Sequence, residues 1–224
     1  MIYFMPISDK EQLESQYQAW MPHLPLSRQA KLLRYRFAKD RWLCAAAYML
    51  LLYALKNEYN LTGEQIDMQI AESGKPFLSS HPHIHFNLSH CDAGVACGIS
   101  DTPIGIDVEM VKQINDNVVK RVCSASDRLI LKYAVNPERA FAALWTLKES
   151  WVKATGCGLA FPLDEVNVKE YPTNHYYVCK EGYIAQLCAV SFPVVFAVCT
   201  PDTFDKVDQT VSIVNTTIFQ GGLA

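Results

Sequence analysis

The apolar residues of this chain follow two periods, and each period predicts a different kind of element. A long apolar segment begins after Asp40 and continues through Tyr59 to Asn60, which is typical of a buried helix and its end. Shorter segments resemble half-buried strands, in which successive side chains point to opposite faces. These predicted strands span residues 66–70, 84–88, 94–99, 104–108, 166–169, 176–179, 185–190 and 194–199. Short turns separate the second, third and fourth of them, so we expect those three to form an antiparallel meander.

Three further helices are predicted from residues that favour helix ends. Ser27 is a preferred N-cap for a segment rich in basic residues. Ser124 begins a capping box, which predicts a helix over residues 128–134. The dipeptide Asn136-Pro137 favours the start of a longer helix, and Gly156 favours its end.

Both parts of the chain therefore show helices, then a strand, then a group of strands. This similarity indicates a weak internal repeat, about half the chain long. We expect an α+β fold of two similar halves, residues 1–104 and 105–224, each with helices packed on a small antiparallel sheet. A ligand site is expected at the seam between them, because binding sites favour such interfaces.

The composition limits the classes of function. Half of the 224 residues are apolar, so the chain can bury a substantial core. A net charge of −3 excludes a globally basic nucleic-acid-binding protein. The longest apolar run, Trp42 to Leu55, has 14 residues, fewer than the ~20 that span a bilayer. The start of the chain lacks the features of a secretory signal, so we expect the eight cysteines to be reduced thiols in the cytoplasm.

Two neighbouring acidic residues are the first candidates for chemistry. Asp107 and Glu109 are two residues apart in a predicted strand, so they project from the same face. Such carboxylates repel each other unless a positive charge lies between them. Mg²⁺ with a phosphate ligand fits this pattern, because Mg²⁺ prefers oxygen ligands. The alternative is that both form the solvated face of an amphipathic strand.

The predicted helix that begins at Asn136-Pro137 carries a second group of charged residues. Lys148 falls within the apolar stripe of this helix, so it must either extend to solvent or be paired. Glu149 and Lys153 are four residues apart and face the same side. They form either a surface ion pair, worth roughly 0.3–0.5 kcal/mol, or a metal-binding carboxylate beside a phosphate-binding ammonium.

Other residues are candidates for contacts with an anion. Ser89 and His90 end a predicted strand and are able to bind phosphate oxygens, although such a pair is also common in turns. Six basic residues within positions 28–41 face a single acid, Asp40. This excess indicates either an anionic partner or a solvated helix face.

Together, these segments resemble the 4′-phosphopantetheinyl transferases, of the large type with two similar halves that activates peptide and polyketide synthetases. The match begins with Ile104-Gly105-Ile106-Asp107-Val108-Glu109 and continues about 40 residues later with Trp145-Thr146-Leu147-Lys148-Glu149-Ser150-Trp151-Val152-Lys153. Each motif alone is weak, whereas both in this order and separation are highly specific. Two further motifs of that family match Gly74-Lys75-Pro76 and Phe86-Asn87-Leu88-Ser89-His90, and the similarity extends to about Val198.

The resemblance implies that coenzyme A binds at the interface of the two halves. Lys75 and Pro76 would lie against its adenine. Its phosphates would be held by residues of the basic helix and of the strand motif: Arg28, Lys31, Ser89 and His90.

The resemblance also implies a magnesium site on the coenzyme A diphosphate. Asp107, Glu109 and Glu149 would bind the ion, and Lys148 and Lys153 would lie near it. Glu149 and Lys153 are the expected catalytic residues, with Glu149 as the candidate base. Some relatives carry a glutamate where this chain has Asp127, whose role is therefore left open beside its place in the capping box.

The implied reaction transfers the 4′-phosphopantetheine moiety of coenzyme A to a serine hydroxyl of an apo carrier protein, acyl or peptidyl, and releases 3′,5′-bisphosphoadenosine. One alternative is a non-catalytic module that binds coenzyme A or a carrier protein. Another is a magnesium-dependent hydrolase that cleaves the coenzyme A diphosphate. We expect a cytoplasmic monomer that binds neither nucleic acid nor a membrane.

Overall fold

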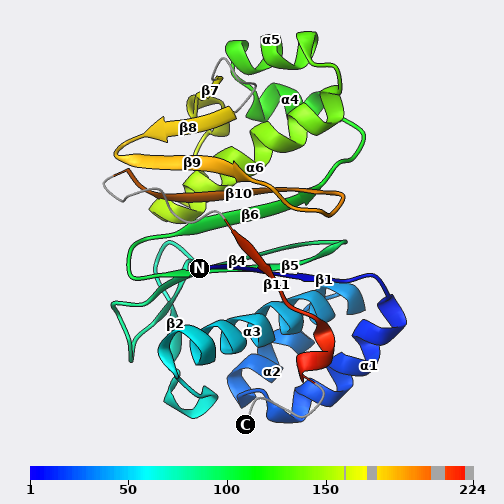
Figure 1. The fold of residues 1–224 in the computed structure, drawn as a ribbon, viewed down its shortest axis with the longest axis vertical. Helices are drawn as coiled ribbons and strands as arrows, with labels where there is room; N and C mark the ends of the chain where they lie inside the picture. The colour runs from blue at the N-terminus through cyan, green and yellow to red at the C-terminus, as the bar shows by residue number, and fades with distance from the viewer. Residues whose placement is uncertain (159, 171–175, 203–209, 220–224) are drawn as a thin grey trace.

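The computed structural model describes residues 1–158, 160–170, 176–202 and 210–219, and it stacks two β-sheets between layers of helix (Figure 1). The first sheet has the strand order β11 (Val211–Ile213), β1 (Ile2–Pro6), β5 (Gly94–Ser100) and β4 (His85–Cys91). The second has the order β6 (Gly105–Met110), β10 (Val194–Pro201), β9 (Tyr183–Cys188), β8 (Tyr176–Lys180) and β7 (Val168–Glu170). A separate two-stranded sheet pairs β2 (Met68–Ile70) with β3 (Pro76–Leu78). The fold is therefore of the α+β class.

Helices cover the outer face of each sheet (Figure 1). On the first sheet, α3 (Ala38–Tyr59) packs on β4 and β5, and α1 (Lys10–Trp20) and α2 (Leu26–Leu33) pack on α3. On the second, α6 (Pro137–Thr155) packs on β6, β9 and β10, with α5 (Ala125–Tyr133) against it and α4 (Asp116–Val122) close by. The described residues also include the 3₁₀ helices η1 (Met21–His23), η2 (Gly63–Gln65), η3 (Leu163–Glu165) and η4 (Thr216–Phe219). None of the described helices combines the length and apolar character needed to cross a membrane.

The strands divide their side chains between apolar layers. On β1, Ile2 and Phe4 belong to a cluster between the two sheets, whereas Tyr3 and Met5 belong to the cluster around α3. Burying one large apolar side chain contributes roughly 1.5–3 kcal/mol. The layer between the sheets therefore holds the two halves together.

The two longest helices end where the sequence predicts. The helix α3 stops at Asn60, which adopts the left-handed conformation with φ 54°. The helix α6 begins after Asn136 and stops at Gly156, with φ 72°. The predicted capping box is also confirmed, because the Asp127 N–H donates to Ser124 Oγ and the Ser124 N–H donates to Asp127 Oδ2.

Two local predictions are wrong. Ser27 lies inside α2, and the residue at the N-cap is Pro25, which offers no side-chain acceptor. The predicted three-stranded meander stops after β4 and β5, because β6 pairs with β10 in the other sheet. The sequence pattern also gives no prediction for β1, β11, α1 or α4.

The predicted division into residues 1–104 and 105–224 needs one correction. The strand β11 pairs in parallel with β1 of the first sheet. Val214 and Phe219, which follow β11, belong to the apolar cluster around α3. Residues 211–219 therefore complete the first half of the molecule, although they lie near the end of the chain.

Candidate active site

Strand β6 carries the two carboxylates that the sequence places on one face. Ile106 and Val108 belong to the apolar cluster between the sheets. Asp107 and Glu109 alternate with them, so both carboxylates lie on the side of the strand that faces α6. Asp107 has only 3% of its surface exposed, while Glu109 is half-buried.

A glycine allows β6 and α6 to lie unusually close together. A Cβ atom on Gly105 would stand 2.1 Å from the carbonyl oxygen of Ser150 and 2.3 Å from the backbone nitrogen of Ala154. Any side chain at this position would force the strand away from the helix. The close packing brings the last turns of α6, with Lys153, next to Asp107.

Lys153 and Ser89 share one oxygen of Asp107. The Lys153 ammonium lies 2.6 Å from Asp107 Oδ1, and Ser89 Oγ donates a hydrogen bond of 2.8 Å to the same oxygen. Lys153 also donates to Ser89 Oγ at 3.2 Å. Residues from β4, β6 and α6 thus meet in one polar network, to which both sheets contribute.

The carboxylates of the site act electrostatically on one another. Burial raises the pKa of Glu109 to about 7, the charges of Asp107 and Glu149 add to the rise, and Lys112 and Lys153 oppose it. Burial also raises the pKa of Glu149, where Lys153 opposes the rise and Asp107 adds to it. Three acidic groups therefore share a site in which two ammonium groups provide the positive charge, and an additional cation would stabilise their ionised forms.

The three carboxylates are suitable Mg²⁺ ligands by their chemistry, but their side chains are not arranged around one common point. In the described part of the chain, no group of three or more His, Cys, Asp or Glu side chains is arranged to hold a metal. Asp107 Oδ2, however, is buried and has no hydrogen-bond partner among the described residues, and a buried acceptor is costly without a positive or donor group beside it. Carboxylate oxygens are the ligands that Mg²⁺ prefers. Asp107, Glu109 and Glu149 are thus a suitable donor set.

Asn87 joins the two sheets at this site, although the sequence reasoning did not single it out. The edge strands β4 and β6 lie against each other but belong to different sheets. The Ile106 N–H donates to Asn87 Oδ1 at 2.8 Å, and the Val108 N–H donates to Ser89 Oγ at 3.3 Å. Side chains of β4 thus act as hydrogen-bond partners for β6. Because Asn87 and Ser89 are two residues apart on a strand, their shared face is the sequence signal that points to Asn87.

A cavity of about 340 Å³ at the junction of the halves contains the two residues expected against an adenine. Its lining combines Lys75 and Pro76 with Ala154 and Tyr183 of the second half. The Lys75 ammonium donates to the carbonyl oxygens of Ile104 at 3.2 Å and Ala154 at 2.9 Å. Burial lowers the pKa of Lys75 to about 8. Lys75 therefore borders this cavity and ties the halves together.

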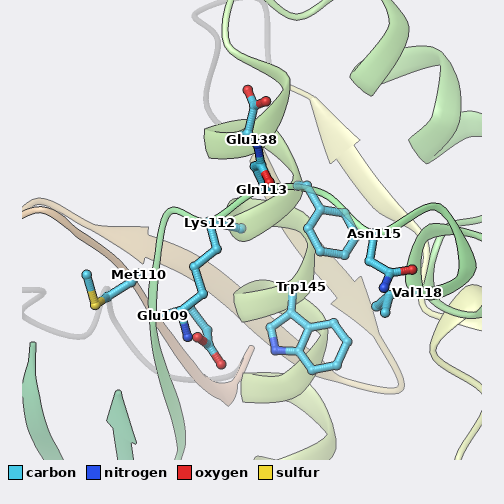
Figure 2. A pocket seen from close by; sticks show the side chains of 10 residues that line it. Glu109, Met110, Lys112, Gln113, Asn115, Val118, Glu138 and Trp145 are labelled. Carbon is cyan, nitrogen blue, oxygen red and sulfur yellow. The ribbon is translucent and has the colours of Figure 1, made fainter. Parts of the chain in front are cut away.

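Trp145 lines two further cavities, each of which reaches one carboxylate of the site. The first, of about 200 Å³, is bordered by Glu109 and Lys112, and Figure 2 shows the indole beside these two side chains. The second, of about 630 Å³, is bordered by Glu149 and Phe161. Each cavity is large enough for part of a ligand, so the cluster has free space on two sides of the indole.

The structure places Lys148 away from this cluster, which corrects the expectation that it lies near a diphosphate. Lys148 is fully buried and forms an ion pair with Asp127 Oδ2 at 2.5 Å. Its ammonium also donates to the carbonyl oxygens of Val122 at 2.8 Å and Leu163 at 3.0 Å. All three donors are therefore engaged inside the second half. The same contacts give Asp127 a structural role beyond its capping box.

The predicted phosphate-binding residues of the first half divide into two groups. Arg28, which the resemblance implies as a phosphate contact, is buried, with its guanidinium carbon 4.5 Å from the ring centre of Tyr48. Lys31 is exposed on α2, and His90 is exposed near the end of β4. Burial lowers the pKa of the His90 imidazole, the Lys153 charge adds to the fall, and the charges of Asp40 and Asp107 oppose it.

Two family models of known proteins match this chain, one in each half. The family model described as 4′-phosphopantetheinyl transferase superfamily matches residues 103–199. The model described as 4′-phosphopantetheinyl transferase, N-terminal, matches residues 11–99. The two matches together include every predicted site residue.

Curated relatives match most of the chain. The 4′-phosphopantetheinyl transferase psf-1 of Bacillus pumilus is 31% identical over 75% of this chain and 72% of its own. A 4′-phosphopantetheinyl transferase of Bacillus subtilis is 31% identical over 75% of this chain and 83% of its own. The 4′-phosphopantetheinyl transferase Sfp of Bacillus subtilis strain 168 is 28% identical over 81% of this chain and 88% of its own. Among solved structures, Helicobacter pylori holo-[acyl-carrier-protein] synthase in complex with coenzyme A aligns with 44% of this chain and 98% of its own, at 20% identity and a TM-score of 0.37.

The stacked sheets, the shared polar network and the paired carboxylates define an α+β protein with a cluster of acidic and basic side chains between β4, β6 and α6. The chain belongs to the 4′-phosphopantetheinyl transferase family. It is therefore an enzyme of that type.

Proposed function

We propose that this enzyme transfers the 4′-phosphopantetheine group of coenzyme A to a serine hydroxyl of an apo carrier protein, in a reaction that depends on Mg²⁺. The observation that carries this proposal is the convergence of Asp107, Glu109, Glu149 and Lys153 where the two halves meet. The cluster combines oxygen ligands for a cation with an ammonium for phosphate oxygens. Because one chain contributes both halves, the proposed site needs no second copy of the protein.

Coenzyme A would bind along the junction of the halves. The cavity of about 340 Å³ that contains Lys75 and Pro76 would hold its adenine. Ser89 and His90, on the adjacent strand β4, and Lys31, on α2, would bind its phosphates. With the adenine in that cavity, the diphosphate would extend along β4 towards the carboxylate cluster.

Asp107, Glu109 and Glu149 would hold Mg²⁺ beside the diphosphate. When bound, Mg²⁺ supplies positive charge that screens the diphosphate and stabilises the negative charge that develops during transfer. The half-buried position of Glu109 and the buried positions of the other two carboxylates limit access of water to the cluster. In such an environment, fixed charges interact more strongly than they do in water.

The transfer step needs positioning and one proton acceptor. The serine oxygen attacks the β-phosphorus of coenzyme A, the bond from that phosphorus to the bridging oxygen breaks, and 3′,5′-bisphosphoadenosine leaves. Glu149 is the proposed base that accepts the serine proton, since it borders a cavity through which an acceptor side chain would approach. The Lys153 ammonium donates hydrogen bonds to diphosphate oxygens, so alignment and electrostatics supply most of the rate enhancement.

The test is to incubate the protein with coenzyme A and Mg²⁺, with and without a panel of apo carrier proteins. We expect the carrier to gain the mass of one phosphopantetheine group on its serine, with release of 3′,5′-bisphosphoadenosine. A matched carrier with Ser→Ala at the acceptor position should remain unmodified.

Two other outcomes would contradict the proposal. Cleavage of the coenzyme A diphosphate without any carrier would indicate a hydrolase. Binding of coenzyme A or a carrier with no product at any Mg²⁺ concentration would indicate a binding module. The panel also identifies which class of carrier is preferred.

A further inference from the structure

The Lys153 ammonium neutralises one oxygen of the Asp107 carboxylate, Oδ1, while the other oxygen, Oδ2, has no hydrogen-bond partner among the described residues. It lies 2.6 Å from Asp107 Oδ1, and it is the ammonium that contacts this carboxylate in the described structure. The Asp107 side chain is only 5% exposed, so an unbalanced charge there would be costly. Lys153 therefore supplies the positive charge that the acidic cluster requires when no metal is present.

We infer that Lys153 is an internal counter-ion that competes with the divalent cation for Asp107 and leaves this carboxylate when the cation binds. The inference rests on the proposed metal role of Asp107, Glu109 and Glu149. Mg²⁺ lies about 2.0–2.1 Å from its oxygen ligands, and an ammonium in contact with the same carboxylate would be repelled at that range. A divalent cation on the unpartnered Oδ2 would lie close to the ammonium on Oδ1, so the repulsion between the two cations weakens the contact of each with Asp107.

The position of Lys153 allows the required movement. The residue lies in the last turn of α6, and its side chain is 25% exposed, unlike the fully buried Lys148. Lys153 has one further partner in the network, Ser89 Oγ at 3.2 Å. A lysine has four rotatable side-chain bonds, so its ammonium is able to move from Asp107 to a nearby phosphate oxygen without a change in the backbone.

This exchange couples the metal to coenzyme A. A diphosphate that attracts the ammonium removes the competitor from Asp107, so each of the two ligands strengthens the binding of the other. The same lysine thus stabilises the acidic site before the ligands arrive and contacts the diphosphate afterwards. A lysine that served only the diphosphate would have no effect on metal binding in the absence of coenzyme A.

The test measures Mn²⁺ binding to the full-length protein without coenzyme A. Mn²⁺ shares the oxygen-ligand preference of Mg²⁺, and its binding is followed directly by electron paramagnetic resonance or calorimetry. We expect Lys153→Met and Lys153→Gln to bind Mn²⁺ about tenfold more tightly than the unmodified protein, as for loss of a charge-assisted contact worth ~1.4 kcal/mol. Gln keeps a hydrogen-bond donor for Asp107, so it provides a second variant in case Met prevents folding.

Lys112→Met is the matched control for a general charge effect. The Lys112 charge acts on Glu109 more strongly than the Lys153 charge does, but the ion pair on Asp107 is formed by Lys153. If direct competition operates, Lys112→Met should change the Mn²⁺ Kd by no more than about threefold at moderate salt, because charges without contact are screened. Equal effects of the Lys112 and Lys153 variants would overturn the inference, as would an unchanged or weaker Kd in the folded Lys153 variants.

The outcome is separable from that of the proposed function. Normal carrier modification by the unmodified protein, together with unchanged Mn²⁺ binding in both Lys153 variants, would refute the competition and leave the function intact. Tighter Mn²⁺ binding in those variants, with no modification of any carrier, would support the competition and refute the function.

Discussion

The Lys148 ammonium and the Asp127 carboxylate form an ion pair of 2.5 Å in which neither side chain has any exposed surface. Because both residues lie in the second half, between α5 and α6, the pair fixes the capped start of α5 against the middle of α6. The two backbone carbonyl contacts of Lys148 extend this anchor to the end of α4 and to η3. The helix that carries Glu149 and Lys153 is thereby held by charges outside the carboxylate cluster.

Removing one partner of this pair should destabilise the protein strongly. Asp127→Ala leaves the Lys148 ammonium buried without its counter-ion, so we expect the free energy of unfolding to fall by about 3–5 kcal/mol. Chemical denaturation followed by circular dichroism measures this change. The double variant Asp127→Ala/Lys148→Met should lose less than Asp127→Ala alone, since it leaves no unpaired charge. A loss below about 1 kcal/mol for Asp127→Ala would contradict the structural role.

The position of Lys148 could be predicted from the sequence only in part. Its place in the apolar stripe of α6 predicts that it is either paired or extended to solvent, and pairing is what the structure has. The partner, 21 residues away, is brought close by the packing of α5 on α6, and no local period reveals that packing. From the sequence, the charge of Lys148 and its position beside Glu149 favour a contact with phosphate. In the structure, Lys148 is instead buried against Asp127 of α5.

The carboxylates of the cluster should be needed for turnover much more than for folding. Asp107→Asn keeps the size of the side chain but removes its charge, so we expect carrier modification at saturating Mg²⁺ to fall by at least about 10²–10³-fold. Glu149→Gln should have an effect of similar size. Rates come from the mass of the carrier, and thermal unfolding verifies that the variants are folded. Near-normal activity of either variant would exclude the proposed metal site.

The matched control for these variants is an acidic residue outside the cluster. Glu138 borders the same cavity as Glu109 but belongs to the first turn of α6. Glu138→Gln should therefore change the rate by less than about threefold, because Glu138 is partly exposed and its charge is screened by salt. A large loss in this control would show that the negative charge of the region matters more than the carboxylate positions.

The hydrogen bond from Ile106 N–H to Asn87 Oδ1 should align β6 with β4. Asn87→Ala leaves a buried N–H without a partner, which costs about 1–3 kcal/mol of stability. We also expect a lower kcat, since β6 carries Asp107 and Glu109. Asn87→Asp keeps the acceptor oxygen and should recover most of the stability. If both variants lose the same stability, the hydrogen bond is not the cause.

The strand pattern predicts the chemistry of β6 well, but not the sheet to which β6 belongs. The period of two places Asp107 and Glu109 on one face, and Ile106 and Val108 on the other, whatever the neighbouring strand is. The choice of β10 over β5 depends on contacts that are distant along the chain, as does the parallel pairing of β11 with β1. Short loops favour pairing between strands that are adjacent in the chain, so the sequence predicts the meander, and this prediction is wrong.

Replacing Gly105 should separate the two elements that carry the site. The Cβ atom of Gly105→Ala would overlap backbone atoms of Ser150 and Ala154, which cannot rotate away as a flexible side chain can. We expect a loss of roughly 1–3 kcal/mol in stability, as for overpacking elsewhere, and a larger loss of kcat. Gly63→Ala is a suitable control, since a Cβ there meets no atom within 4 Å. Equal stability of the two variants would show that β6 and α6 move apart without cost.

The buried ammonium of Lys75 should make stability depend on pH in the alkaline range. Its pKa is lowered from 10.5 to about 8, with burial as the main cause. Between these values the unfolded chain binds more protons than the folded chain, so the contribution of Lys75 to stability rises as pH increases from about 8 to about 10.5 and is lost as pH falls through about 8. Over this window, the unfolding free energy of the unmodified protein should therefore rise relative to that of Lys75→Met. Lys56→Met is the control, since Lys56 lies at the exposed end of α3, and its difference from the unmodified protein should be nearly constant. Denaturation curves at pH 7 to 10 measure both differences, and a flat profile for Lys75→Met would show that the lysine is not desolvated at the junction of the halves.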